Sequence, residues 1–365
     1  MNTYSEFSFN FASVFLQNKA TETACVSPVS LLLPLAAVAS ASERKTKAEF
    51  ARVLGETVID PPKLLADMHE LCNVLNDCPS IDELTNTIVG EKNHEFLPIF
   101  INNMRNTFGN NVGMQPGKGD NITLTNIIHF KEDWATHFSE SEERFYSTPY
   151  GIERDGQSVP FLYYDEERLG YTKNSHCQSV TIPFKTAQKA PGFSGLQAFS
   201  SAAKPSCYMT FAMPLDCSID DILVRPEQIA KMLRCEIDGY QNVEVHLPAF
   251  KLEQEKVLND DLKQLGLQSA FNEYVADFPN MAELKDDERL YIKEAKQEIM
   301  VNVNATGAEA RAKTQIKMSF VTIGSTIPYV QCRKEILRFN HPFLFTIWIR
   351  TSNNDMVPLF IGAKR

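Results

Sequence analysis

The sequence lacks the long, uncharged apolar run that a membrane-spanning helix requires. Its most apolar stretch, residues 26–41, is interrupted by Pro28, Pro34 and several serines, so it is too short and too broken to cross a bilayer. The first residues show neither the basic start nor the apolar core of a secretory signal peptide. We therefore expect no membrane segment, and a protein that is cytoplasmic or is secreted without a classical signal peptide.

Positive charge is also scarce. The chain of 365 residues has 36 Lys and Arg against 46 Asp and Glu, a formal net charge of −10. Nucleic-acid-binding proteins normally present a basic field, because phosphate contacts dominate their affinity. The charge balance predicts that neither nucleic acid nor an anionic polymer of the heparin type is a partner.

Cysteine is too rare for a disulfide scaffold: eight cysteines are spread along the chain, with no C-x-x-C and no Cys/His cluster at metal-ligand spacing. Most lie in apolar runs, which favours buried free thiols in a reducing compartment. The alternative is a short-loop pair between Cys72 and Cys78 in an exported protein. No metal and no cofactor is predicted.

The sequence carries no convincing catalytic motif. Residues 192–195 resemble a nucleophile elbow only superficially, because the glycine spacing is wrong and the segment is a polar loop. Residues 116–119 lack the upstream glycine and the following Ser or Thr of a phosphate loop. The seven histidines show no metal pairing. We do not expect an enzyme.

Apolar spacing predicts helices mainly in the first third. Phe7, Phe11, Val14 and Phe15 form one helical stripe, and Ser27 followed by Pro28 is a typical helix start. Further helices are predicted over residues 43–54, which end at Gly55, and over 252–271, where Leu258, Leu262 and Leu265 recur at helical spacing.

Strands are predicted over residues 121–130, 207–213, 242–247, 290–303, 343–349 and 357–361. No βαβ alternation, internal repeat or clear linker is present. The prediction is a single α+β domain over residues 1–365 with large, mainly antiparallel sheets. Residues 185–205 are polar and rich in Gly, Ser and Ala, which predicts a long surface loop.

One segment shows unusually regular alternation. Ala308, Ala310, Ala312 and Thr314 fall on one parity, and Glu309, Arg311 and Lys313 fall on the other. Such a pattern is typical of a strand with one buried and one solvated face. Ala, Glu, Arg and Lys are also good helix formers, so the local pattern alone leaves helix and strand open.

From this segment outward, the chain resembles the serpin family of protease inhibitors over nearly its whole length. Trp134 resembles the family's "breach" tryptophan, and residues 303–312 resemble its hinge. Other matching blocks, in family order, are residues 27–30, 126–138, 159–160, 182–185, 243–251, 265–271, 339–345 and 358–362.

The resemblance implies a serpin fold with an exposed reactive-centre loop at about residues 305–330. It also implies a suicide-substrate mechanism, in which a cut loop inserts into the main sheet and traps the protease as a covalent acyl complex. The hinge would be Gly307, Ala308, Glu309, Ala310, Arg311, Ala312, Lys313 and Thr314. The alternating segment fits insertion, because its charges lie on the parity that stays in water.

Counting forward from Gly307 places the reactive bond at Val321–Thr322. Counting back from Phe339 places it nearer Ile327, and Phe320, Met318 and Ile323 are neighbouring alternatives. This window is mostly apolar, which predicts an elastase-like or chymotrypsin-like serine protease as target, with a cysteine protease as another candidate. A monomer is expected. The rival interpretation is a non-inhibitory serpin that acts as a chaperone, carrier or storage protein.

The chain departs from the family pattern at several places. Ala305 stands where inhibitory hinges usually have glutamate, and Gln297 stands where histidine is usual. Residues 84–126 are short for a serpin, so a helix that flanks or crosses the main sheet is reduced; we expect the crossing helix to be the one missing. Asn304 also begins an N-x-T glycosylation sequon.

Overall fold

The computed structural model describes residues 3–91, 95–119, 121–148, 156–187, 206–235, 241–284, 288–307, 334–351 and 353–365. The helices lie mainly in the first third of the chain, as predicted. They are α1 (Thr3–Gln17), α2 (Pro28–Ser40), α3 (Arg44–Val53), α4 (Pro61–Asn76), α5 (Pro98–Phe108), α6 (Ile219–Leu223), α7 (Pro226–Met232) and α8 (Asn259–Leu265). Short 3-10 helices, η1 and η2, cover Lys185–Ala187 and Ser269–Phe271.

The strands form two sheets. They are β1 (Ala24–Val26), β2 (Ile81–Glu91), β3 (Val112–Gly119), β4 (Ile122–Phe130), β5 (Ser139–Phe145), β6 (Gln157–Lys173), β7 (Cys177–Pro183), β8 (Ser206–Pro214), β9 (Gln241–Pro248), β10 (Phe250–Val257), β11 (Ile292–Val303), β12 (Glu335–Arg338), β13 (Phe343–Arg350) and β14 (Met356–Lys364).

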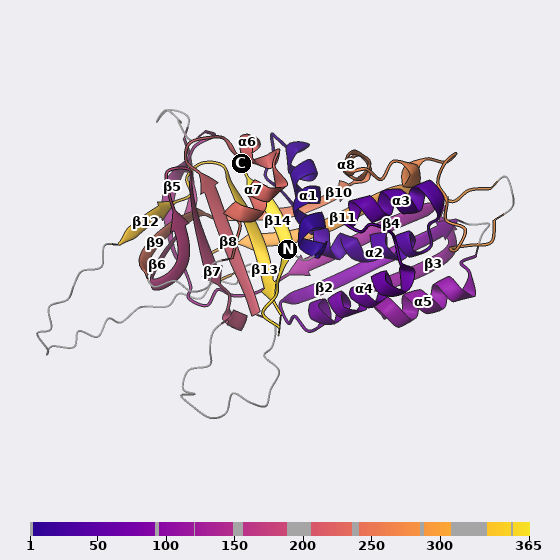
Figure 1. Ribbon diagram of the computed structural model, residues 1–365. Helices are drawn as coiled ribbons and strands as arrows, with labels where there is room; N and C mark the ends of the chain where they lie inside the picture. The colour runs from indigo at the N-terminus through magenta and orange to yellow at the C-terminus, as the bar shows by residue number, and fades with distance from the viewer. Residues whose placement is uncertain are drawn as a thin grey trace, which may run out of the picture.

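The smaller sheet has five strands in the order β10-β11-β4-β2-β3, and α2, α4 and α5 lie over one of its faces (Figure 1). It is mixed: β11 pairs with β4, and β2 with β3, in parallel, while the other pairs are antiparallel. The larger sheet has nine strands in the order β1-β14-β13-β8-β7-β6-β9-β12, with β5 also paired to β6. The predicted α+β class is confirmed.

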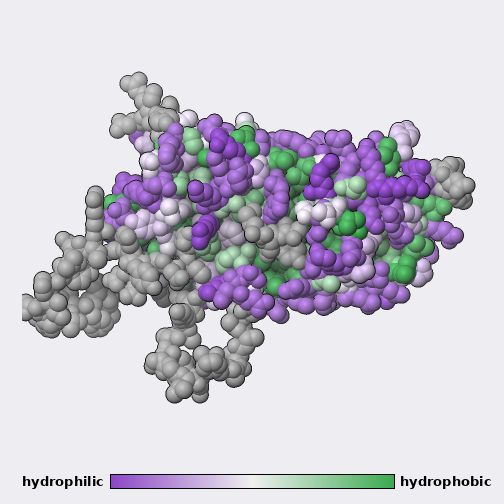
Figure 2. Space-filling model, viewed as in Figure 1, coloured by the Kyte–Doolittle hydropathy of each residue, from purple (hydrophilic) through white to green (hydrophobic). Residues whose placement is uncertain are grey.

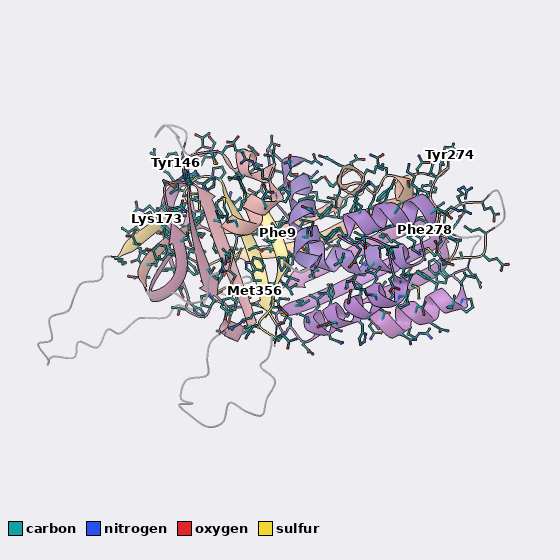
Figure 3. The ribbon with its side chains drawn as sticks, in the orientation of Figure 1. Phe9, Tyr146, Lys173, Tyr274, Phe278 and Met356 are labelled. Atoms are coloured by element: carbon teal, nitrogen blue, oxygen red, sulfur yellow. The ribbon has the colours of Figure 1, made fainter. Side chains whose placement is uncertain are left out.

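A continuous apolar core joins the two sheets and includes residues from Phe7 on α1 to Ala363 on β14. Phe9 lies between the helical half and the larger sheet, where its ring centroid is 6.1 Å from that of Trp348 (Figure 3). Outside the core, the face of the molecule in Figure 2 is mainly hydrophilic, with apolar side chains in small scattered groups. A shared core favours the single-domain prediction.

The helix predicted over residues 252–271 is wrong in its first part. Residues 252–257 belong to β10, which pairs with β11 from Phe250↔Val303 to Val257↔Lys296, and the helix covers only Asn259–Leu265. The leucine spacing begins at Leu258, the N-cap residue, and gives no support for helix before it. The preceding residues alternate in exposure, as expected for a strand, and pairing with β11 satisfies their backbone.

The connection between β3 and β4 leaves no room for a helix. β3 ends at Gly119 and β4 begins at Ile122, so only two residues separate the strands. The sheet face opposite α2 is accordingly partly exposed: on β4 the buried residues alternate with Thr123, Thr125, Ile127 and His129. A helix packed there would bury hydroxyl groups without partners. The absence of the crossing helix, expected from the short segment 84–126, is confirmed.

Candidate functional site

We call the parallel pairing of β4 and β11 the seam. It runs from Ile292↔Ile122 to Met300↔His129 at the centre of the five-stranded sheet. β4 is held on its other edge by β2, and β11 by β10. Because β4 and β11 point the same way, one further strand placed between them could run antiparallel to both. Adding it would move the strands apart by about 4.8 Å, one strand spacing.

Residues 304–307, the closing turn, reverse the chain directly after β11. The backbone N–H of Asn304 donates to the carbonyl of Gly307 at 3.1 Å. The side-chain oxygen of Asn304 accepts from the backbone N–H groups of Thr306, at 3.0 Å, and Gly307, at 3.1 Å. An asparagine that bonds backbone groups two and three residues ahead is a typical Asx turn. The chain therefore leaves Gly307 antiparallel to β11, at the end of the seam.

Gly307 already makes an antiparallel bridge to Asp133, three residues beyond β4. The approach is too close for any side chain: an added Cβ would lie 2.2 Å from the carbonyl oxygen of Glu132 and 2.5 Å from Cα of Asp133. Glycine is therefore required here for backbone proximity.

Trp134 binds the closing turn through two hydrogen bonds. Its ring is fully buried and stacks on Phe184, with centroids 4.4 Å apart and planes at 5°. Its Nε1–H donates to the carbonyl of Asn304 at 2.8 Å, and its backbone N–H donates to the carbonyl of Thr306 at 2.9 Å. The tryptophan thus holds the turn by both its side chain and its backbone.

The same turn carries an unpaired donor. The side-chain nitrogen of Asn304 is buried and has no hydrogen-bond partner within the described parts of the chain. A buried unsatisfied donor costs about 1–3 kcal/mol. This cost lowers the stability of the turn.

Beneath the seam lies a network of buried polar side chains. Gln297 on β11 accepts from the backbone N–H of Ser27 and donates to its carbonyl, both at 2.9 Å. Gln297 also donates to the side-chain oxygen of Asn126 on β4, and the Asn126 amide donates to Asn86 on β2 at 2.6 Å. Ser27, Asn126 and Gln297 are at most 3% exposed. The network links both sides of the seam to the start of α2.

The hydroxyl of Ser27 does not cap α2, although Ser27 is the N-cap residue as predicted. It donates instead to the carbonyl of Leu359 on β14 at 2.6 Å. Ser27 therefore joins Gln297 and β11 to the larger sheet.

On the outer face of the sheet, His129 crosses the seam. Its Nδ1 lies 3.3 Å from a carboxylate oxygen of Glu83 on β2, and its Nε2 lies 3.8 Å from one of Glu298 on β11. These groups are partly exposed, so each contact contributes at most about 1 kcal/mol. The seam is thus closed mainly from beneath, by buried groups.

Comparisons with known proteins agree with this geometry. The family model described as "Serpin (serine protease inhibitor)" matches residues 2–118 and 115–364. The chain belongs to the serpin family. The family is described as one of serine protease inhibitors.

Curated relatives of this serpin include the leukocyte elastase inhibitors of Xenopus tropicalis, 24% identical with 94% of this chain and 93% of the relative covered, and of Homo sapiens, 22% identical with 98% and 97% covered. Among solved structures, the thermophilic serpin tengpin in its native state superposes with a TM-score of 0.76 at 20% identity, covering 99% of this chain and 93% of tengpin. At this identity the structural likeness establishes the fold alone.

The structure brings together two of the predicted site residues of this serpin, Gly307 and Trp134, through the closing turn. The rest of the predicted hinge, residues 308–314, and all candidate reactive-bond residues, 318 and 320–323, lie outside the described residues. Of the polar loop 185–205, the structure describes only residues 185–187, which form η1.

Asn304 is a residue that sequence reasoning missed. In the sequence, Asn304 is notable only as the start of a glycosylation sequon, whereas in the structure its side chain organises the closing turn. An asparagine directly after a strand and three residues before a glycine is an available turn signal, and it could have predicted this role.

Histidine 246, one of two histidines in predicted strands, lies on β9 of the larger sheet, away from the seam. Its Nδ1 contacts the carboxylate of Glu143, and its Nε2 lies 2.9 Å from Glu244. The ammonium group of Lys334, where the described chain resumes, is 2.7 Å from Glu244 and 2.8 Å from Asp165. Hydrogen bonding to Lys334, and then to His246, lowers the pKa of Glu244 to about 2. This cluster fixes the second end of the segment 308–333.

No group of three or more His, Cys, Asp or Glu side chains within the described ranges could hold a metal ion. In the same residues, no helix has both the length and the apolar character needed to span a membrane.

Proposed function

We propose that this serpin inhibits a protease as a suicide substrate, by inserting its cleaved loop into the seam as a new strand. One observation carries the proposal: the closing turn returns the chain against the end of the seam, where Gly307 and Asp133 already form the first antiparallel bridge. A strand that continued from Gly307 in the same direction would pair with β11 on one side and β4 on the other.

The residues that follow Gly307 suit such a strand. Ala308, Ala310, Ala312 and Thr314 would face the core, and Glu309, Arg311 and Lys313 would stay in water. Alanine loses no side-chain rotamer entropy on burial, so these positions add little cost to insertion. No charge lies on the buried parity, where an unpaired charge would oppose insertion strongly.

We further propose Val321–Thr322 as the reactive bond, with Phe320, Met318 and Ile323 as the neighbouring alternatives. The window is apolar, and the relatives are named leukocyte elastase inhibitors. Both points favour an elastase-like or chymotrypsin-like serine protease, bound as a covalent acyl complex, over a trypsin-like one. A cysteine protease is the second target class for the same loop.

The protein in this proposal is a cytoplasmic monomer without a cofactor. The net charge of −10 supports independence from an anionic polymer.

The test is a protease panel with complex formation read on a denaturing gel. We expect wild-type protein to form a complex with elastase or chymotrypsin that survives SDS. Ala310→Asp places a charge on the buried parity and should abolish the complex while the loop is still cut. Arg311→Asp is the matched control: it reverses a charge on the exposed parity and should leave the complex intact.

Mass spectrometry of the released C-terminal fragment identifies the bond. A fragment that begins at Thr322 supports the assignment, and one that begins at Met318 contradicts it. If every protease cuts the loop and none is retained, the protein is a non-inhibitory serpin.

A further inference from the structure

Two buried thiols face each other at the boundary between the two sheets. Cys78 lies between α4 and β2, and Cys207 is the second residue of β8. Their sulfur atoms are 3.5 Å apart, and the residues are 2% and 0% exposed. The pair that the sequence suggested, Cys72 with Cys78, is not the one that the fold brings into contact. All described cysteines, these two included, are free thiols in the structure.

We propose that Cys78 and Cys207 are a redox modification site, at which a hydroperoxide forms an intramolecular disulfide that holds the seam closed. Formation of the disulfide does not depend on the proposed function. Its effect on the seam rests on the proposed function.

The two thiols have different roles in this reaction. The hydrogen bond from Cys207 holds the pKa of Cys78 below its ordinary value, and backbone amides of Ser80 and Ile81 act in the same direction. The same hydrogen bond, together with burial, raises the pKa of Cys207. Cys78 is therefore the nucleophile, since the thiolate is the form that attacks peroxide.

The step balances with hydrogen peroxide as oxidant. The Cys78 sulfur attacks one peroxide oxygen and the O–O bond breaks, which gives a sulfenic acid and one water. The Cys207 sulfur then attacks the Cys78 sulfur, the S–OH bond breaks, and the hydroxyl leaves as a second water with the thiol proton. Two thiols lose two electrons in total, and one peroxide is reduced to two waters.

Contacts around the seam indicate which half of the small sheet stays with the larger one. Gln297 binds Ser27, whose hydroxyl binds Leu359 on β14. On β10, the side-chain amide of Gln254 donates to the carbonyl of Cys25 on β1. β10 and β11 are therefore attached to the larger sheet beside the seam. The chain that follows β4 is attached to it as well, through the bridge of Trp134 to Phe184 at the end of the seam. In this proposal β4, β2 and β3 are the half that moves when a strand enters.

Cys78 belongs to the moving half. Three residues after it, Ile81 pairs with Phe130 of β4. Cys207 instead pairs with Ile349 of β13 in the larger sheet, and its carbonyl accepts from the backbone N–H of Phe184 at 3.1 Å. A disulfide limits the distance between the two Cα atoms to about 6.8 Å. Strand insertion requires a separation of about 4.8 Å at the seam. The bond would tie the moving half to the fixed sheet and oppose that separation.

The first experiment asks whether the bond forms. Full-length protein is treated with hydrogen peroxide, free thiols are alkylated after unfolding, and peptides are mapped without reductant. We expect a cross-linked Cys78–Cys207 peptide pair in wild type. Cys72→Ala is the matched control, because Cys72 is a buried thiol on the preceding helix, 3% exposed. The cross-link should persist in Cys72→Ala and be absent in Cys207→Ser and Cys207→Ala. If Cys78 and Cys207 both stay alkylatable in wild type, the proposal is wrong.

The second experiment asks what the bond does. Oxidised and reduced wild-type proteins are cut in the loop by a protease that is then removed, and their melting temperatures are compared. We expect cleavage to raise the melting temperature of reduced protein, no rise in oxidised protein, and recovery of the rise on adding a thiol reductant. Equal rises in the cross-linked and reduced forms would overturn the seam-locking role. No rise in reduced protein would contradict loop insertion itself and leave the cross-link result standing.

Discussion

At the residue scale, Gly307 is the tightest backbone contact of the site. Gly307→Ala should destabilise the native protein by about 1–3 kcal/mol, because the added methyl overlaps the carbonyl of Glu132 and forces the closing turn away from Asp133. Urea unfolding of the uncut protein measures the loss. Gly113→Ala on β3 is the control: its added Cβ would meet only the Asn86 carbonyl oxygen, at an ordinary 3.6 Å. Equal losses in both variants would contradict a specific role for close approach at Gly307.

Gln297 stands where the family usually has histidine, and it still satisfies both backbone groups of Ser27. Gln297→Leu keeps much of the volume but leaves buried donors and acceptors unpaired, so the free energy of unfolding should fall by about 2–4 kcal/mol. Glu298→Gln, on the next residue and the outer face, should change it by less than about 0.5 kcal/mol. Thermal or urea unfolding compares the two. A small loss in Gln297→Leu would show that the network does not stabilise the seam.

The Glu244 carboxylate should make the stability of the fold depend on pH in the acidic range. Its pKa falls from the ordinary 4.5 to about 2 in the folded state, chiefly through Lys334. Because the folded-state pKa is lowered, the stabilisation is present above pH 4.5 and is lost as the pH falls toward about 2.

Glu244→Gln should therefore be less stable than wild type near neutral pH, and the difference should shrink on acidification. Urea unfolding at about pH 6 and about pH 3 measures it. Glu335→Gln is the control on the neighbouring strand β12, since Glu335 forms an ion pair with Lys173, at 3.4 Å, and is outside the Glu244 cluster. A difference between wild type and Glu244→Gln that is constant with pH would contradict the assignment.

At the element scale, the sequence predicts a helix or strand correctly where the apolar pattern within that segment is enough to define it. The stripe Phe7, Phe11, Phe15 gave α1, and the apolar alternation of β4 matches its alternating burial. The segment 252–257 failed because its state depends on pairing with β11, which is distant in the sequence. Short-range spacing could not supply that information.

The site shows the same division. Trp134 and Gly307 were identified through the family resemblance, and each proved to have a structural role that its residue type explains. The contact between Cys78 and Cys207 was not predictable, because it joins positions 129 residues apart on different sheets. The missing crossing helix was predictable, since chain length between β2 and β4 limits what can fit.

At the scale of the whole molecule, the two sheets share one core while the small sheet contains a seam that is attached unequally on its two sides. Helices α2, α4 and α5 lie over one face of that sheet, and the connection of β3 to β4 is too short for a helix across the other (Figure 1). β4, β2 and β3 are joined as a continuous paired unit. Opening the seam therefore breaks the backbone ladder between β4 and β11, together with the Gln297–Asn126 hydrogen bond across it, and leaves the other ladders of the small sheet paired. Movement as a block is the arrangement that loses fewest backbone bonds.

Insertion of the cut loop into the seam should increase the stability of the molecule. An inserted strand would pair on both edges and replace one parallel ladder by two antiparallel ones, which are slightly more stable per residue. Cleavage anywhere in residues 318–323 should therefore raise the melting temperature, with each added kcal/mol worth roughly 1–2 °C for a chain of this length. Scanning calorimetry before and after cleavage measures the rise.

Ala310→Asp separates insertion from the cut itself. The variant should be cleaved at the same bond, but its melting temperature should rise little or not at all. The reason is that the new carboxylate would enter the core unpaired. In Arg311→Asp, cleavage should raise the melting temperature as much as it does in wild type. Equal rises in all three proteins would mean that cleavage stabilises the molecule without a strand entering the seam, and the parity of residues 308–314 would then have no part in the mechanism.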